Sequence, residues 1–139
     1  MDADEVIAAL GLRPHPEGGW FTETWREPAA PGERSLSTAI YYLLRAGERS
    51  HWHRVDATEV WHYYAGDPLV LEVAQTDGPP RRHSLGADLE ANQRPQVVVP
   101  KGAWQQARPL GGWTLVGCTV APGFRFEGLE LAPPRWTPG

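Results

Sequence analysis

The stretch that decides the fold runs from Gly47 to Gly66 and reads GERSHWHRVDATEVWHYYAG. Its distinctive feature is a pair of imidazoles at His51 and His53, followed by the carboxylate of Glu59. Residues i and i+2 of a β-strand point to the same face, so the two histidines are expected to share a face. A turn at residues 55–57 would return Glu59 to the same space. The stretch therefore predicts two strands that aim these polar side chains into one cavity.

These three side chains have the chemistry of metal ligands. First-row divalent metals accept imidazole nitrogen and carboxylate oxygen together. We therefore expect His51, His53 and Glu59 to hold a divalent transition metal such as Fe, Mn, Ni or Zn, with a fourth ligand from elsewhere in the chain. Open positions on such a metal would bind a substrate, oxygen or an activated water. A metal-free polar pocket built from the same residues is the alternative.

Length and composition predict a single globular domain, residues 1–139. Hydrophobic residues make up 41% of the chain and charged residues 22%, which is typical of a folded protein with a buried core. The net charge is −4 and no basic cluster occurs, so no nucleic-acid surface is expected. No apolar run approaches the ~20 residues that span a bilayer, so no membrane protein is expected.

The cysteine and histidine content adds further expectations. Cys118 is the only cysteine, so no internal disulfide can form, and a cytoplasmic setting is expected. The N-terminus starts acidic and lacks the basic segment of a secretory signal, which agrees with that setting. Cys118 itself is expected to be a buried apolar residue. His15 and His83 are expected on loops or on the surface.

Prolines and glycines divide the chain into short segments. The chain has 14 prolines and 15 glycines, which favours an all-β domain. A short helix is expected at residues 3–10, capped by Asp2 or Asp4 and ended by a glycine. A turn is expected at residues 76–80 and a loose tail at residues 133–139. The expected strands are residues 20–26, 35–44, 49–54, 58–65, 69–74, 81–85, 96–100, 113–120 and 124–131, with a short one before residue 107. This pattern is typical of a β-sandwich or jelly-roll barrel.

Three further residues are considered for the site. Glu23 lies between two aromatic residues on one face of its strand. It is either a general base with a raised pKa in a dry cavity or a solvent-exposed residue of an edge strand. Tyr63 shares the face of Glu59 and is either a catalytic partner or a core residue. His62 falls on the opposite face, so a structural hydrogen bond is expected for it.

Two segments resemble the two motifs of the cupin superfamily. The stretch quoted above has the glycine, the His-x-His pair, the glutamate and the closing glycine of the first motif. Residues 100–105, PKGAWQ, resemble the second motif, Pro-x-Gly-x-x-His. The strings PHPEGGWFTETWR, HRVDATEVWHYYAGDPL, PQVVVPKGAWQQAR and LVGCTVAPGFRFEGLEL resemble one small family of single-domain cupins, which is similar in fold to dTDP-sugar epimerases. This resemblance covers nearly the whole chain.

The resemblance implies an all-β cupin jelly-roll barrel with a short N-terminal helix and a site inside the barrel. It places Gln105 where the second motif has a histidine, so Gln105 becomes the fourth candidate metal ligand, weaker than an imidazole. Five residues separate His53 from Glu59, where cupins usually have three or four, so a bulge or a longer turn is needed. Barrels of this kind often pair through their sheets, so a homodimer is expected.

Three functions fit these observations. The first is a metal-dependent isomerase, lyase or dioxygenase. The second is a metal-independent epimerase- or isomerase-like enzyme, with His53 as base and Glu23 or Tyr63 as its partner. The third is a non-catalytic protein that binds a small ligand between aromatic walls. In each case the expected partner is a small polar metabolite, and the resemblance to sugar epimerases implies a carbohydrate-related one.

Overall fold

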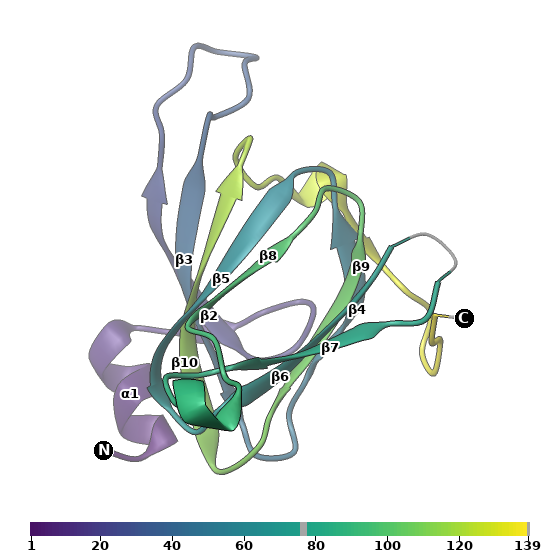
Figure 1. The fold of residues 1–139 in the computed structure, drawn as a ribbon. Coiled ribbons are helices and arrows are strands. Elements are labelled where there is room, and N and C mark those ends of the chain that lie inside the picture. Colours follow the sequence, from purple (N-terminus) through teal and green to yellow (C-terminus); the bar gives the residue numbers. More distant parts are fainter. Residues whose placement is uncertain (76–77, 139) are drawn as a thin grey trace.

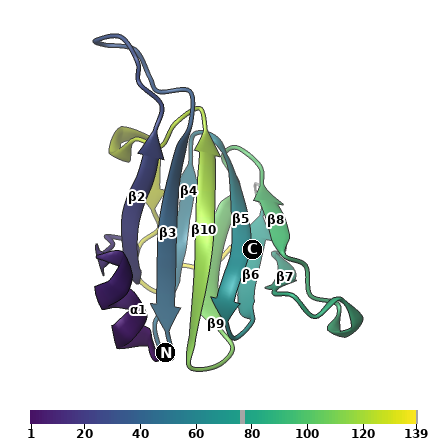
Figure 2. The same ribbon diagram turned by 90° about the vertical axis from the view of Figure 1, so that its left-hand side faces the viewer.

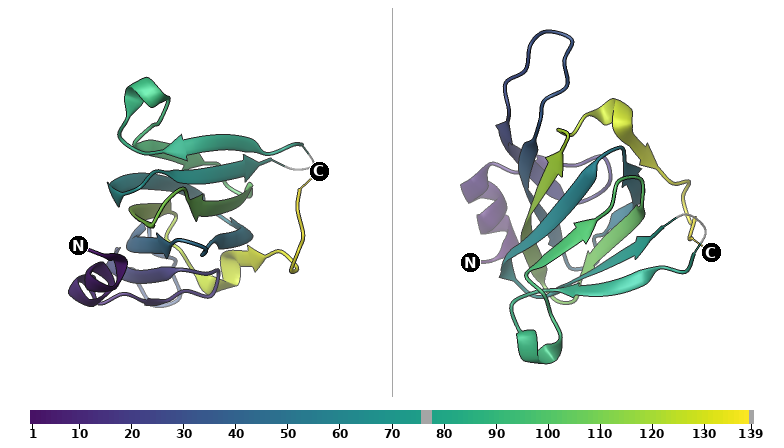
Figure 3. Two further views of the ribbon diagram at one scale, coloured as in Figure 1. Left: turned by 90° about the horizontal axis from the view of Figure 1, so that it is seen from below. Right: turned by 45° about the horizontal axis from the view of Figure 1, so that its top comes forward.

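Two antiparallel sheets face each other across the interior of the protein (Figure 1). The computed structural model describes residues 1–75 and 78–138. In spatial order, the larger sheet contains β1 (Arg13–Pro14), β2 (Trp20–Arg26), β3 (Thr38–Arg45), β10 (Trp113–Ala121), β5 (Thr58–Gly66) and β8 (Gln96–Val99). The smaller sheet contains β11 (Leu129–Leu131), β4 (Ser50–Val55), β9 (Trp104–Pro109), β6 (Leu69–Ala74) and β7 (Arg81–Leu85). The right-hand view in Figure 3, in which the top of the molecule is turned forward, looks between these sheets. The predicted all-β jelly-roll barrel is confirmed.

The predicted N-terminal helix is also confirmed, as α1 (Ala3–Leu10). The side chain of Asp2 accepts a hydrogen bond from the backbone N–H of Glu5, and the Glu5 side chain accepts one in return, so the helix begins with a capping box. Gly11 ends it in the left-handed conformation. The buried side chain of Val6 then packs with Leu43 of β3. The helix therefore covers part of the outer face of the larger sheet (Figure 2).

The main core lies between the two sheets. Strand β10 pairs with both β3 and β5, so it is central in the larger sheet. Alternate residues of these strands point inward and meet the apolar strand β6 of the smaller sheet. The largest fully buried side chains of this cluster are Trp61, Tyr42, Leu44, Leu69, Leu71 and Leu85. Buried polar side chains from β4, β5 and β9 lie against the same core, and they form the site described below.

A one-residue bulge in β4 overturns the expectation that His51 and His53 share a face. Ser50 pairs with Ala107 and His53 pairs with Gln105, so three steps along β4 oppose two along β9. The extra residue shifts the alternation of side chains. As a result, Ser50 and His53 are both buried, whereas His51 is only partly buried.

The C-terminal region differs from the sequence-based expectation in two ways. Phe126–Gly128 forms a short 3-10 helix, so only Leu129–Leu131 of the expected final strand pairs with β4. The tail is not loose, because the ring of Trp136 packs on Trp52 and Trp104, with centroids 6.0 and 4.6 Å apart. The turn expected at residues 76–80 lies partly outside the described residues. In residues 1–75 and 78–138, no helix is long and apolar enough to cross a membrane.

The loop before β2 is pinned against β4. Its backbone turns tightly, since Gly18 N–H donates to His15 O and His15 N–H donates to Gly19 O. The backbone N–H of His51 donates to Glu17 O at 2.8 Å. Gly18 has a φ of +109°, and a Cβ at this position would lie 2.1 Å from Arg49 O. Only glycine therefore lets this loop lie so close to β4.

We expect Gly18→Ala to destabilise the fold strongly. Gly32→Ala is the matched control, because Gly32 also has a positive φ, of +82°, but a Cβ added there would meet nothing within 4 Å. Gly32→Ala should lower the free energy of unfolding by about 1–2 kcal/mol, because alanine is strained in the left-handed backbone conformation. Gly18→Ala should cost at least about 2 kcal/mol more, since the clash involves backbone. Urea unfolding followed by tryptophan fluorescence measures both losses, and equal losses would contradict this account of the loop.

Candidate functional site

A cavity between the sheets brings together polar residues from distant parts of the chain. Its floor is formed by buried residues and its mouth by the exposed residues Glu23, Arg26 and Phe126. Apolar and aromatic side chains form most of the wall between them. The lining residues are His15, Glu17, Phe21, Glu23, Arg26, Thr38, Ile40, His53, Val55, Glu59, Cys118, Val120, Phe124 and Phe126. The volume is about 60 Å³, which is room for a few water molecules.

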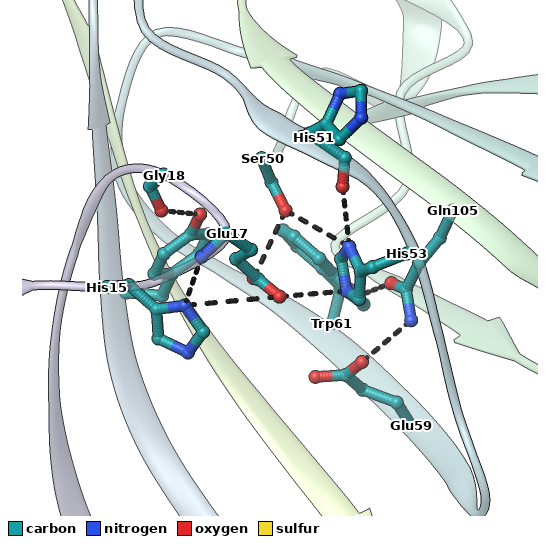
Figure 4. Close-up of polar contacts among 10 residues, drawn as sticks. His15, Glu17, Gly18, Ser50, His51, His53, Glu59, Trp61 and Gln105 are labelled. Carbon is teal, nitrogen blue, oxygen red and sulfur yellow. Dashed lines mark hydrogen bonds and ion pairs between the residues drawn. The ribbon is translucent and has the colours of Figure 1, made fainter. Parts of the chain in front are cut away.

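His53 and Glu17 form a buried pair at the floor of the cavity (Figure 4). His53 Nδ1 lies 2.8 Å from the carbonyl oxygen of His51. A carbonyl oxygen only accepts, so Nδ1 carries a proton. The other nitrogen, Nε2, lies 3.0 Å from Glu17 Oε2. The second oxygen of Glu17 accepts a hydrogen bond from Ser50 Oγ at 3.1 Å. The two residues therefore share one proton between Nε2 and Oε2.

A chain of hydrogen bonds that runs from Trp61 through Gln105 holds Glu59 in place. Trp61 Nε1 donates to Gln105 Oε1 at 2.8 Å. An indole N–H can only donate, so this bond fixes which way the Gln105 amide faces. Gln105 Nε2 then donates to Glu59 Oε1 at 2.9 Å. The other carboxyl oxygen of Glu59 points away from Gln105 (Figure 4).

Burial controls the charge of these groups. Burial raises the pKa of Glu59 to about 7, and the nearby Glu17 carboxyl adds to the rise. Burial also raises the pKa of Glu17 and lowers the pKa of His53. The pKa of the Cys118 thiol lies well above its usual value because the thiol is buried beside these carboxyls. The floor therefore favours neutral groups, with Glu59 able to gain or lose a proton near neutral pH.

His15 and Glu17 show where sequence reasoning fell short. The expectation that His15 is a loop or surface residue is wrong in one respect, because its side chain is 5% exposed and lines the cavity. Its Nδ1 accepts a hydrogen bond from the Glu17 backbone N–H at 3.1 Å, so a neutral His15 carries its proton on Nε2. Burial lowers the pKa of His15, which favours this neutral form. The sequence pattern did not single out Glu17. The PHPEGG string is the available signal, since it places both residues in a rigid loop.

The predicted metal ligands are not brought together as a set. His51 Nε2 donates to Ala132 O at 3.0 Å, and its Nδ1 lies 3.1 Å from an Arg49 Nη2 donor, so both nitrogens are engaged outside the cavity. Gln105 Oε1, the atom that would ligate, accepts from Trp61. Among the described residues, no group of three or more His, Cys, Asp or Glu side chains is placed to hold a metal ion. This arrangement of His51, His53, Glu59 and Gln105 does not fit a metal, and metal binding stays a prediction.

The other sequence candidates lie away from the floor. Glu23 is exposed at the mouth, where both its oxygens accept hydrogen bonds from Arg26, at 2.9 and 2.7 Å. The Tyr63 hydroxyl donates to Gly66 O at 2.6 Å, and Tyr63 does not line the cavity. His62 lies 2.9 Å from Thr119 Oγ1, which is a structural hydrogen bond of the expected kind. The catalytic roles of Glu23 and Tyr63 stay predictions.

Comparisons with known proteins give a consistent picture. The family model described as "Cupin superfamily (DUF985)" matches residues 4–132. A Shewanella oneidensis protein of known crystal structure is 41% identical, with a TM-score of 0.90, covering 95% of this chain and 85% of that one. A hypothetical protein from Leishmania major is 34% identical, with a TM-score of 0.87, covering 95% and 88%.

A more distant structure shares the fold alone. Oxalate decarboxylase from Bacillus subtilis superposes with a TM-score of 0.66 at 12% identity, covering 85% of this chain and 29% of that one. An enzyme thus uses the same barrel, but its activity does not transfer at this identity. The family match and the two relatives above 30% identity show that this chain belongs to the cupin superfamily, in the family described as DUF985.

Proposed function

We propose that this cupin is a metal-independent, isomerase- or epimerase-like enzyme that transfers protons at a carbon beside a carbonyl group. Its substrate would be a small polar metabolite related to carbohydrates. The observation that carries the proposal is the pair of buried proton-holding units on one cavity. One unit is Glu59 and the other is the Glu17–His53 pair.

One of the two units can accept a proton, and the other can donate one. The oxygen of ionised Glu59 that Gln105 does not hold can accept a proton from carbon, and a pKa near 7 suits a general base at neutral pH. The Glu17–His53 pair holds one shared proton, which it can give to the carbonyl oxygen of the substrate. The substrate then becomes an enediol, with Glu59 neutral and Glu17 ionised beside a neutral imidazole. Delivery of the first proton to the former carbonyl carbon, and of the proton of the neighbouring hydroxyl group to the pair, completes an isomerisation.

Surrounding residues would keep these groups ready. The Trp61–Gln105 chain holds one oxygen of Glu59 as an acceptor, which leaves the other for the substrate. Ser50 donates to one oxygen of Glu17, and the other oxygen shares the proton with His53. The aromatic and aliphatic wall keeps water from the reacting carbon. Within the proposal, Glu59 therefore takes the role of base that the sequence pattern gives to His53.

Several expectations from the sequence stay predictions beside this proposal. They are the homodimer, the cytoplasmic location and the absence of nucleic-acid and membrane partners. The divalent metal expected from the sequence also stays a prediction, as an alternative route. A non-catalytic binding protein is the remaining alternative.

We expect the enzyme to exchange carbon-bound hydrogen of its substrate with solvent. Incubation in D₂O with a panel of aldoses, ketoses and nucleotide sugars, followed by NMR, measures this exchange. Glu59→Gln and His53→Gln should each slow exchange by about 10²-fold or more, since each removes a group that transfers a proton.

Glu72→Gln is the matched control. Glu72 also accepts a hydrogen bond from a glutamine, Gln106, at 2.5 Å, but it does not line the cavity. Exchange in this variant should match the unmodified protein. Exchange that disappears with EDTA and returns with a divalent metal would favour the metal-dependent alternative. A ligand that binds and is recovered unchanged would favour the binding protein.

The raised pKa of Glu59 also predicts a pH dependence of stability. Its carboxyl keeps a proton up to about pH 7 in the folded state, against an ordinary pKa of 4.5. The folded state therefore binds more protons between these values, and stability falls as the pH rises through this window. Below this window, the raised pKa of Glu59 contributes about 3 kcal/mol to the free energy of unfolding. Urea unfolding at pH 5 and pH 7.5 should show a smaller difference for Glu59→Gln than for the unmodified protein. An unchanged difference would mean that Glu59 does not titrate in this window.

A further inference from the structure

We infer that the cavity admits only an uncharged end of its ligand, a hydroxyl group beside a carbonyl, and excludes carboxylate and phosphate groups. The hydroxycarbonyl part rests on the proposed function. The exclusion of anions rests on the geometry of the cavity alone, so the two parts can fail separately.

The floor offers an anion no fixed positive charge. Among the described lining residues, Arg26 is the only lysine or arginine, and it lies at the exposed mouth. Its Nε and Nη2 donate to Glu23 and its Nη1 donates to Phe124 O at 3.0 Å. At the floor, by contrast, the carboxyl groups of Glu17 and Glu59 are buried. An anion there would lose its hydration without a counter-charge and would be repelled by an ionised carboxylate.

The two imidazoles do not supply that charge. His53 Nε2 is already engaged with Glu17, and His53 Nδ1 with the backbone. His15 Nδ1 accepts from the Glu17 backbone N–H, which requires that nitrogen to be unprotonated. A doubly protonated His15 would lose this bond. The hydrogen bond to Nδ1 therefore keeps His15 neutral, and any charge on His53 is balanced by the Glu17 carboxyl group that shares its proton.

The polar groups that face the cavity match a hydroxycarbonyl. Glu59 presents an oxygen that accepts a hydrogen bond from a hydroxyl group. His15 also lines the cavity, and its neutral ring carries a donor on Nε2, which suits a carbonyl or hydroxyl oxygen. Between them, Phe21 and Ile40 present apolar surface to the carbon atoms. A ligand end with one donor, one acceptor and an apolar face is the complement of this surface.

The small volume sets the orientation of a larger ligand. About 60 Å³ takes only one end of a sugar-sized molecule. The remainder must lie at the mouth beside Arg26 and Phe126, which are exposed. Any anionic group of the substrate therefore belongs at the mouth, with the reacting carbonyl end directed inward.

Two probes of similar size test the inference on the full chain: neutral dihydroxyacetone and anionic glycolate, each titrated at pH 8 and followed by protein NMR. Dihydroxyacetone should bind at least about tenfold tighter, a difference of ~1.4 kcal/mol. Glu59→Gln removes one carboxylate together with the acceptor for the ligand hydroxyl, so the ratio of dihydroxyacetone affinity to glycolate affinity should fall at least about fivefold. Glu72→Gln should leave both affinities unchanged.

The possible outcomes test the exclusion of anions, the hydroxycarbonyl assignment and the proposed function separately. Glycolate that binds as tightly as dihydroxyacetone overturns the exclusion of anions. Binding of neither probe overturns the hydroxycarbonyl assignment. Dihydroxyacetone that binds selectively but exchanges no carbon-bound hydrogen in D₂O contradicts the proposed function and leaves the inference about the ligand end intact. Loss of selectivity in Glu72→Gln would show that overall charge, rather than the cavity, discriminates.

Discussion

The extra residue in β4 is the constraint on which the site depends. It turns Ser50 and His53 inward together, while His51 turns outward. Without it, the regular alternation of a strand would bury His51 in place of Ser50. Ser50 would then lose its bond to Glu17, and His53 would lose its bond to the His51 carbonyl oxygen. One local irregularity thus decides which polar atoms meet in the barrel.

Two carboxyl groups in one apolar cavity are costly to bury, and their partners show how the cost is limited. Glu17 shares a proton with His53 and accepts from Ser50. Glu59 accepts from Gln105, whose amide is in turn held by Trp61. Among the described residues, no buried side-chain polar atom lacks a hydrogen-bond partner. Each buried carboxyl group of the site therefore has hydrogen-bond partners that offset part of the cost of burying it.

Local signals predicted the fold well, and long-range pairing explains what they missed. The cap at Asp2 and the glycine at position 11 mark α1 correctly, and turn residues mark most strands. Of the four residues expected together, His53 and Glu59 line one cavity and Gln105 bonds to Glu59, whereas His51 lies outside. The bulge was not foreseen in β4, because it arises from pairing with β9. Glu17 was missed because nothing in its own loop shows that β4 lies beside it.

The position of His51 has a consequence for how the protein is made. Its backbone N–H bonds to Glu17 near the start of the chain, and its ring bonds to Ala132 near the end. Contacts between such distant residues form late, since long loops must close before they can be made. During synthesis, the strand that carries His53 stays without its neighbour β11 until residues 129–131 have been made. The cavity, whose wall includes Phe124 and Phe126, therefore cannot be completed before this segment is available.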